Sequence, residues 1–245
     1  MLFVREHQKV QLTPQGRELA TSLQRLFGEM EAAVRKASGE AQQEMLTVNL
    51  PPTFATRWLA PRLSDFRARY PHIDLSITTD RLQQPRDARA FDCVVIFGEA
   101  PWPRTPCEPV LKERHVLASS PNLWQRGKPP ALQKSTLLHV LDGDVRLPVW
   151  EHWLEVHGPR DIDAGPGLNF STLDQAINAA VSGAGVVVVD EVMIVRELQA
   201  KTLLRHNALE LEGPCGYWFV RNSQRSESAA RIGLFRDWLL GQAKA

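Results

Sequence analysis

Two hydroxyl-bearing segments stand where a strand gives way to a helix, and together they could hold an anion. Thr53 follows Pro51-Pro52 after an apolar run, and Ser171-Thr172 follows the run Leu168–Phe170. The first N–H groups of a helix lack partners within it, and the helix dipole adds partial positive charge there. Hydroxyls beside two such starts predict a carboxylate site if both face one cleft. The ordinary alternative is a capping box made by Ser171 and Asp174, which the residues alone favour.

Other patterns that carry chemistry are missing from the sequence. It contains no GxSxG, no GxGxxG after a strand, no P-loop and no HExxH. His152 and His157 are five residues apart, a spacing that does not align two imidazoles on one helix face. The cysteines are odd in number and form no CxxC pair, which argues against a disulfide framework. We therefore expect no enzyme activity, no catalytic residue, no metal and no cofactor.

The composition describes a globular protein with a sizeable core. The chain has 245 residues, is 43% hydrophobic and carries a formal net charge of +1, so any contact with nucleic acid must be local. No run approaches the roughly 20 apolar residues of a membrane span, and Met1–Val4 leads directly into charged residues without a signal-peptide pattern. The sequence predicts a cytoplasmic protein without a membrane partner.

The first forty or so residues predict a hairpin followed by a helix. Leu2–Arg5 and Val10–Leu12 flank a polar turn, and Thr13-Pro14 offers an N-cap with proline at the first helical position. Apolar residues then recur at alternating spacings of four and three, the seam of a coiled coil; they are Leu19, Leu23, Leu26, Met30 and Ala33. About two heptads are present, so a helix packed on its own domain is the alternative.

Beyond a plausible hinge at Ser38–Glu40, strand-like and helix-like segments alternate. The expected strands are 45–50, 72–79, 93–97, 110–118, 137–141, 168–170, 185–190 and 216–221. The expected helices are 53–70, 150–157, 172–182 and 226–241, with Gly183 as the C-cap of the third. This alternation predicts an α/β fold of two lobes, and the fully apolar strands suit a parallel sheet covered on both faces.

Two segments carry a resemblance to a known family. Pro51-Pro52-Thr53-Phe54-Ala55-Thr56-Arg57-Trp58-Leu59-Ala60-Pro61-Arg62-Leu63 and the following Phe66–Leu75 closely resemble LysR-type transcriptional regulators, in the branch that includes the glycine cleavage and β-lactamase gene activators. Residues 2–16 resemble the family's wing-to-linker signature. The resemblance implies a two-lobed, type 2 periplasmic-binding-protein-like effector domain after a remnant wing and a linker helix.

The domain limits implied by the resemblance are specific. Residues 1–40 would hold the remnant wing and the dimerisation linker, 45–120 and 222–245 the first effector-binding lobe, and 121–221 the second lobe. The chain would cross between lobes near Ser120 and return near Asn222. In the family a complete winged helix-turn-helix precedes the effector domain, whereas only about forty residues do so here, so we expect the helix that reads the major groove to have no counterpart in these residues.

The resemblance also implies an effector cleft between the lobes, lined by Pro52, Thr53, Gly98, Glu99, Trp102, Ser171, Thr172 and Tyr217. A glycine at a strand end lets a ligand approach the backbone, and a tyrosine hydroxyl can orient it, although an ordinary turn glycine and a core aromatic are the alternatives. Glu99 departs from the small or polar residue expected there and favours an effector with a cationic group. Trp150 and Trp153 are expected in the core.

These expectations combine into the effector-sensing and oligomerisation region of a LysR-type regulator. Its partners would be a small polar or carboxylate metabolite, a second copy in a homodimer or homotetramer, and promoter DNA in the full-length form, with DNA binding weak or absent in this fragment. Arg5 and Lys9 would contact the DNA backbone. A solute-binding protein of a transport system is the alternative, against which the wing and the heptad seam argue. A two-lobed enzyme is a third possibility, for which no converging catalytic set is found.

Overall fold

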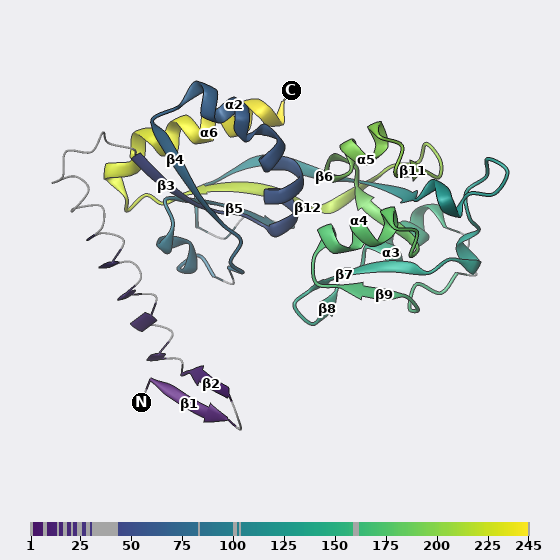
Figure 1. Ribbon diagram of the computed structural model, residues 1–245, viewed down its shortest axis with the longest axis horizontal. Coiled ribbons are helices and arrows are strands. Elements are labelled where there is room, and N and C mark those ends of the chain that lie inside the picture. Colours follow the sequence, from purple (N-terminus) through teal and green to yellow (C-terminus); the bar gives the residue numbers. More distant parts are fainter. Residues whose placement is uncertain are drawn as a thin grey trace.

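The structure is a computed structural model that describes residues 2–6, 9–13, 15–16, 19–20, 22–23, 26–27, 30, 44–82, 84–99, 102, 104–158 and 162–244. Two α/β lobes lie side by side, and an N-terminal arm extends away from the first of them (Figure 1). The chain thus has the two-lobed α/β architecture that its alternating segments predict.

The arm begins with the expected hairpin. Strand β1 (Phe3–Glu6) pairs antiparallel with β2 (Lys9–Leu12), which places the backbones of Arg5 and Lys9 on neighbouring strands. Their side chains lie outside the described residues, so the DNA-backbone contact stays a prediction. The Thr13 hydroxyl accepts a hydrogen bond from Gly16 N at 3.0 Å, as an N-cap residue should.

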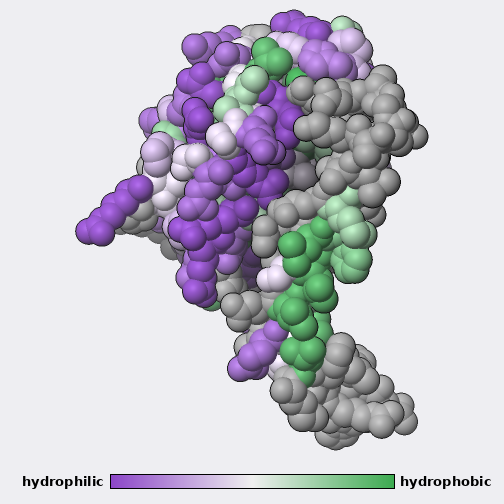
Figure 2. Space-filling model, turned by 90° about the vertical axis from the view of Figure 1, so that its left-hand side faces the viewer, coloured by the Kyte–Doolittle hydropathy of each residue, from purple (hydrophilic) through white to green (hydrophobic). Residues whose placement is uncertain are grey.

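The described residues between Gln15 and Met30 are helical, which confirms the predicted helix over this part of the chain, while its role as a dimerisation linker stays a prediction. Its apolar residues are unusually exposed, between 41% and 57%; they are Leu19, Leu23, Leu26, Phe27 and Met30. They form a continuous apolar band along the arm (Figure 2). These side chains therefore do not pack on the chain's own lobes, which argues against the alternative of an intradomain helix. Ala33 and the hinge at 38–40 lie outside the described residues.

The first lobe is built on three parallel strands with β3 in the middle; they are β3 (Glu44–Asn49), β4 (Ile73–Thr78) and β5 (Cys93–Gly98). Its helices are α2 (Leu63–Arg69) and the C-terminal α6 (Ala229–Ala243), with 3-10 turns at Asp87–Ala90 and Ser226–Ser228. Both helices lie on one face of the sheet (Figure 1). Phe66 of α2 meets Phe235 and Trp238 of α6 edge-on, which ties the two helices together.

The predicted helix 53–70 is helical as far as Arg69 but changes its winding twice. A π-helix (Phe54–Leu59) and a 3-10 turn (Ala60–Arg62) precede α2. Proline has no N–H to donate, so a regular hydrogen-bond ladder fails at Pro61, and Ala60 N instead reaches back five residues to Ala55 O. The Arg62 guanidinium satisfies the Trp58 carbonyl at 2.7 Å. Wide π-turns of this kind are frequent at functional sites.

The second lobe surrounds a second parallel set in which β7 lies between β10 and β9. Its strands are β7 (Leu137–Asp142), β8 (Val145–Arg146), β9 (Leu168–Phe170), β10 (Val186–Asp190) and β11 (Leu204–Arg205). Its helices are α3 (Val149–His157), α4 (Leu173–Val181) and α5 (Val195–Gln199), with 3-10 turns at Pro121–Leu123, Leu132–Lys134 and Glu191–Met193. Gly183 ends α4 with φ +82°, as its predicted C-cap role requires.

Two long antiparallel strands join the lobes, β6 (Cys107–Ser119) and β12 (Leu211–Arg221). The sheet is therefore mixed, and the prediction of a parallel sheet holds only within each lobe. β12 pairs with β5 in the first lobe, whereas β6 pairs with β10 from His115 onward. This pairing favours a crossover near His115, earlier than the predicted Ser120, but the lobe limits stay a prediction.

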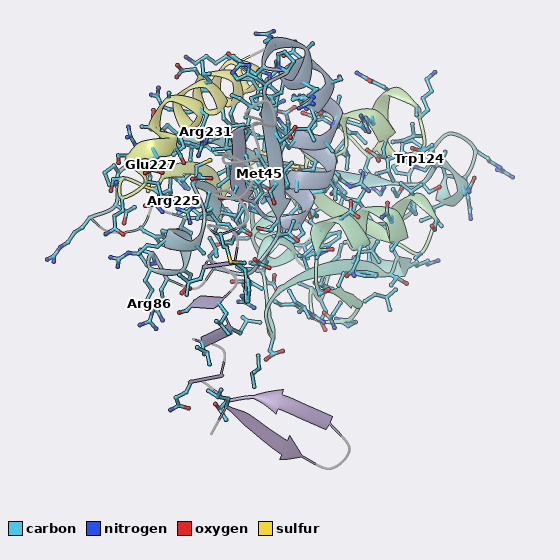
Figure 3. All side chains as sticks on the ribbon, turned by 60° about the vertical axis from the view of Figure 1, so that its left-hand side comes forward. Met45, Arg86, Trp124, Arg225, Glu227 and Arg231 are labelled. Carbon is cyan, nitrogen blue, oxygen red and sulfur yellow. The ribbon has the colours of Figure 1, made fainter. Side chains whose placement is uncertain are left out.

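Apolar side chains fill both lobes. Trp150 and Trp153 are 1% exposed and belong to the core of the second lobe, as expected. Trp124 lies at the end of that lobe farthest from the first, whereas Met45 lies on β3 of the first lobe (Figure 3).

Across the described part of the chain, no helix combines the length and apolar character that a membrane crossing needs.

Candidate functional site

A cleft of about 780 Å³ opens between the lobes, a volume that suits a small-molecule ligand. It is lined by strand ends from the first lobe, the start of α4 from the second, and the crossing strands β6 and β12. All eight residues proposed for the effector cleft line it; they are Pro52, Thr53, Gly98, Glu99, Trp102, Ser171, Thr172 and Tyr217. Their participation in ligand binding stays a prediction.

Thr53 connects the two lobes. Its side chain makes no cap on its own helix. Instead the hydroxyl accepts a hydrogen bond at 3.0 Å from Asp174 N, in the first turn of α4. Thr53 is 6% exposed, so this bond is shielded from water. The oxygen thus occupies a position that an anion would take at the start of α4, while the hydroxyl hydrogen remains available for donation.

The start of α4 is capped one residue later than the sequence suggested. Thr172 is the N-cap, and its hydroxyl accepts from Gln175 N at 3.2 Å. Ser171 does not cap the helix with Asp174; its hydroxyl donates to Gln175 Oε1 at 2.9 Å. Ser171 is therefore an exposed hydroxyl at the cleft edge with a single described partner, which a ligand can replace without uncapping α4.

Arg57 forms a second link between the lobes, beside Thr53. Its Nε donates to Asp174 Oδ1 at 2.6 Å, Nη2 donates to Asn178 Oδ1 at 2.7 Å, and Nη1 pairs with Glu197. The Arg57 side chain is 11% exposed, so the guanidinium is largely removed from water. A planar guanidinium with several partners fixes both distance and orientation. The described contacts thus hold the π-helix against α4 and α5.

Tyr217 forms part of the cleft floor. Its ring centroid lies 4.9 Å from that of Phe54 and 5.0 Å from that of Phe97. Complete burial, followed by the charges of Asp190 and Glu113, raises the pKa of Tyr217 well above its usual value. The phenol therefore stays protonated and can donate a hydrogen bond. Gly98 pairs with Gly216 directly beside it, and the Trp218 indole donates to Gly98 O at 3.2 Å.

Three ionisable residues complete the floor, and sequence reasoning missed them. Glu113, His115 and Asp190 are 8%, 3% and 2% exposed and all line the cleft. His115 Nε2 lies 3.2 Å from Glu113 Oε1, and Cys215 N donates to Glu113 Oε2 at 3.1 Å. Burial raises the pKa of Asp190 to about 6, opposed by the backbone N–H of Arg114 and reinforced by Glu113. The available signal was the carboxylate that ends the apolar run 186–189.

The remaining charged lining is also mainly acidic. Among the described lining residues Arg81 is the one arginine, and its guanidinium pairs with Asp142 at 2.8 Å. Asp80 and Glu99 add further carboxylates to this lining. Asn49 shapes the rim, because its amide donates to Asp80 O at 2.9 Å and its carbonyl oxygen accepts from Asp80 N at 2.8 Å. The cleft therefore combines hydroxyls at one end with carboxylates at its floor.

Metal and thiol chemistry find little support in the described residues. Among them, no three His, Cys, Asp or Glu side chains gather as metal ligands would. Burial raises the pKa of the Cys93 thiol far above its usual range, and burial together with Glu113 raises that of Cys215 to about 12. Burial also raises the pKa of Cys107. Thiols with raised pKa values form little thiolate and are poor nucleophiles.

Comparison with known proteins places these features in a family. Residues 39–244 match the LysR substrate binding domain. The glycine cleavage system transcriptional activator of Escherichia coli K12 is 29% identical over 244 residues, which cover 100% of this chain and 80% of that protein. Similarity to this activator extends through the hairpin and the linker helix, since the whole chain is covered.

Solved structures agree with this match. The effector domain of the regulator AmpR from Pseudomonas aeruginosa is 30% identical, with a TM-score of 0.69 over 82% of this chain and 96% of that chain. A Citrobacter freundii effector binding domain with three substitutions, at a threonine, a serine and a tyrosine, is 26% identical with a TM-score of 0.69, over 82% of this chain and 99% of that chain. These matches favour a regulator over a transport solute-binding protein. The chain belongs to the LysR family of transcriptional regulators, and the cleft lies in its substrate-binding domain.

Proposed function

We propose that the cleft binds a small polar metabolite with a carboxylate group and that binding biases the arrangement of the two lobes. The observation that carries this proposal is convergence: the eight residues implied by the family resemblance come from widely separated segments and line one cleft of about 780 Å³. Clefts at strand ends of α/β folds are frequent ligand sites.

The proposed anion contacts are the hydroxyls of Thr53 and Ser171. Thr53 already accepts from Asp174 N, so it would donate its hydrogen to the ligand, and Ser171 would exchange its bond to Gln175 for one to the ligand. Tyr217 would orient the remainder of the molecule. Because Thr53 and Ser171 belong to different lobes, a ligand that contacts both would favour their present separation over a more open one.

A change in lobe arrangement would reach promoter DNA through the linker helices of an oligomer. The exposed seam at Leu19, Leu23 and Leu26 supports association with a second copy, as a dimer or tetramer. Arg5 and Lys9 are the proposed DNA-backbone contacts, and residues 1–245 alone are expected to bind DNA weakly. Action on promoter DNA would place the protein in the cytoplasm.

Relatives support the same region as a ligand site. One AmpR structure is described as an effector domain, and a Citrobacter freundii effector binding domain carries substitutions at a threonine, a serine and a tyrosine, the residue types of Thr53, Ser171 and Tyr217. Glu99, Glu113 and Asp190 make this cleft acidic, which favours a metabolite that is polar rather than purely anionic.

The test is a thermal-shift screen of carboxylate-bearing metabolites, followed by calorimetry of each hit. A specific ligand should raise the melting temperature in a concentration-dependent manner. Ser171→Ala should weaken the binding of that ligand, whereas Ser182→Ala, which removes an exposed hydroxyl at the opposite end of α4, should not. Hits that bind Ser171→Ala and Thr53→Ala as tightly as wild type would show that the hydroxyl assignment is wrong.

A further inference from the structure

The floor of the cleft presents buried hydrogen-bond acceptors without donors. Asp190 Oδ2 and His115 Nδ1 are shielded from solvent and make no hydrogen bond to any described residue. Both residues are at least 97% buried, and both line the cleft. Native proteins rarely leave such groups unpaired, because each costs free energy in proportion to its lost hydration.

Backbone register explains why these atoms face one point. Glu113 and His115 are two residues apart on β6, so their side chains lie on the same face of the sheet. Asp190 on β10 is the direct cross-strand partner of His115, and such partners have adjacent side chains on one face. The three side chains therefore form one cluster, which we call the acidic floor.

The existing bonds define what the acidic floor lacks. Glu113 is already engaged, by His115 Nε2 at 3.2 Å and by Cys215 N at 3.1 Å. If His115 donates from Nε2 to this carboxylate, its Nδ1 carries a lone pair and can only accept. Asp190 has one oxygen bonded to Arg114 N at 3.2 Å and the other unbonded. Both unpaired atoms are therefore free to accept hydrogen bonds from the N–H groups of a ligand.

The negative charge of the acidic floor favours hydrogen-bond donors that carry a positive charge. The floor holds the carboxylates of Glu113 and Asp190, and Glu99 stands at its edge. Arg81, the one arginine among the described lining residues, pairs with Asp142 and its side chain is 56% exposed, so it does not neutralise the negative charge of the floor. A second, smaller cavity of about 270 Å³ adjoins the cleft through Glu113, His115 and Glu99, and adds Glu151 and Glu155. A cationic group would gain from this field, whereas an anion would be repelled.

We propose that the acidic floor binds a protonated amine of the effector, with Asp190 and His115 accepting its N–H groups and Glu113 supplying further negative charge. This inference rests on the proposed function, since it names a second recognition element of the same cleft. An ammonium offers three donors, which matches acceptors that converge from two strands. The effector class is then an amine-bearing metabolite, zwitterionic if the hydroxyl end also holds its carboxylate.

A matched set of probes separates the two ends of the cleft. The probes share a five-carbon chain. δ-Aminovalerate carries both an amine and a carboxylate, pentylamine carries only the amine, and valerate carries only the carboxylate. Their dissociation constants for the full chain can be measured by ligand-observed NMR at millimolar concentration. We expect both amines to bind wild type at least roughly tenfold more tightly than valerate, the scale of one charge-assisted hydrogen bond.

Two variants of the floor and one control locate the effect. Asp190→Asn and Glu113→Gln should each abolish most of the preference for the amines and leave valerate unchanged. Asp237→Asn makes the same chemical change on α6, where the carboxylate is exposed and outside the cleft, and should behave like wild type. Urea unfolding establishes whether each variant is folded. If Asp190→Asn does not fold, the binding measurements on Glu113→Gln decide the test.

The outcomes distinguish this inference from the proposed function. Valerate that binds wild type as tightly as δ-aminovalerate would overturn the amine site and leave the carboxylate site intact. An amine preference that survives both floor variants would also overturn it, because the amine would then bind elsewhere. If the amines fail to bind while the metabolite screen yields carboxylate ligands, the inference fails and the proposed function stands.

Discussion

The Thr53 hydroxyl of the first lobe accepts a hydrogen bond from Asp174 N of the second lobe at 3.0 Å. This bond places a residue that we propose as a ligand contact at the point where the two lobes meet. Thr53→Val keeps the shape of the side chain but leaves a helix N–H without its acceptor. We expect a loss of about 1–2 kcal/mol in the free energy of unfolding, with Thr53→Ser close to wild type.

Urea unfolding of both variants checks this expectation. Thr202→Val is the matched control, because its exposed hydroxyl donates to Glu197 O at 3.4 Å within the second lobe. Equal stability of Thr53→Val and wild type would mean that the inter-lobe bond contributes nothing measurable.

Arg57→Met should destabilise the protein by roughly 3 kcal/mol, because it leaves Asp174 and Glu197 without their common cation in a largely buried position. Arg67→Met provides the comparison on the following helix. Arg67 pairs with Asp74 at 2.6 Å but is 53% exposed, so its loss should cost at most about 1 kcal/mol. Chemical denaturation with both variants at one pH gives the two differences, and similar values would contradict a special role for the Arg57 link.

The linker seam should hold copies of the chain together, because exposed apolar side chains in a heptad pattern are stabilised by a second helix. Leu23→Asp combined with Leu26→Asp should convert the oligomer to monomer in light scattering. Leu209→Asp, which changes an apolar residue of similar exposure in the second lobe, should leave the mass unchanged. A wild-type protein that is monomeric at micromolar concentration would contradict the role of the seam.

Asp190 should make stability depend on pH in an unusual direction. Its pKa in the folded state is raised to about 6, against a reference value of 3.8. The folded state therefore holds the proton more tightly, and its contribution to stability falls as pH rises from about 4 to 6. Asp190→Asn should remove this slope and stabilise the apo protein above pH 6, by at most about 3 kcal/mol for a shift of about two units.

The pH measurement needs the variant because His206 adds a pH dependence of its own and because polar and charged side chains surround Asp190. Glu113, His115 and Tyr217 face Asp190 from the crossing strands. His206 acts in the opposite direction, since burial lowers its pKa to about 4 and its contribution is lost as pH falls below its usual value of 6.5. The free energy of unfolding of Asp190→Asn minus that of wild type, taken at each pH, gives the contribution of the Asp190 carboxylate. A difference that does not change between pH 4 and 7 would contradict its raised pKa.

Local patterns predicted most of the elements but not their pairing. The apolar run before Asp190, the helix from Thr172 and the C-cap at Gly183 follow from residue types that are adjacent in sequence. The antiparallel pairing of β6 and β12 depends on partners about a hundred residues apart, which no local pattern contains. The π-helix is an intermediate case: Pro61 signals a break, but the widened turn depends on how the chain relaxes around it.

The same distinction applies to the cleft. Thr53, Ser171 and Tyr217 could be proposed because hydroxyls at strand and helix ends are recognisable, and because the family resemblance directed attention to them. Asp190 and His115 read as ordinary strand residues, since their significance lies in a cross-strand pairing that leaves two acceptors unbonded. A sequence does not show which acidic residues of a strand are buried and unpaired, because this depends on the neighbouring strands.

The irregular pairing in β12 has a mechanical consequence. Between Glu212 and Gly216 the register with β6 shifts, and this bulge is where Cys215 N holds the Glu113 carboxylate and where any side chain on Gly213 would collide with it. Glu113 and His115 thus lie on one of the two strands that join the lobes, and Asp190 lies on the neighbouring strand β10. We expect a ligand that draws Glu113 or Asp190 by a fraction of an ångström to shift the crossing strands, and a small rotation there would become a larger displacement at the tips of the lobes.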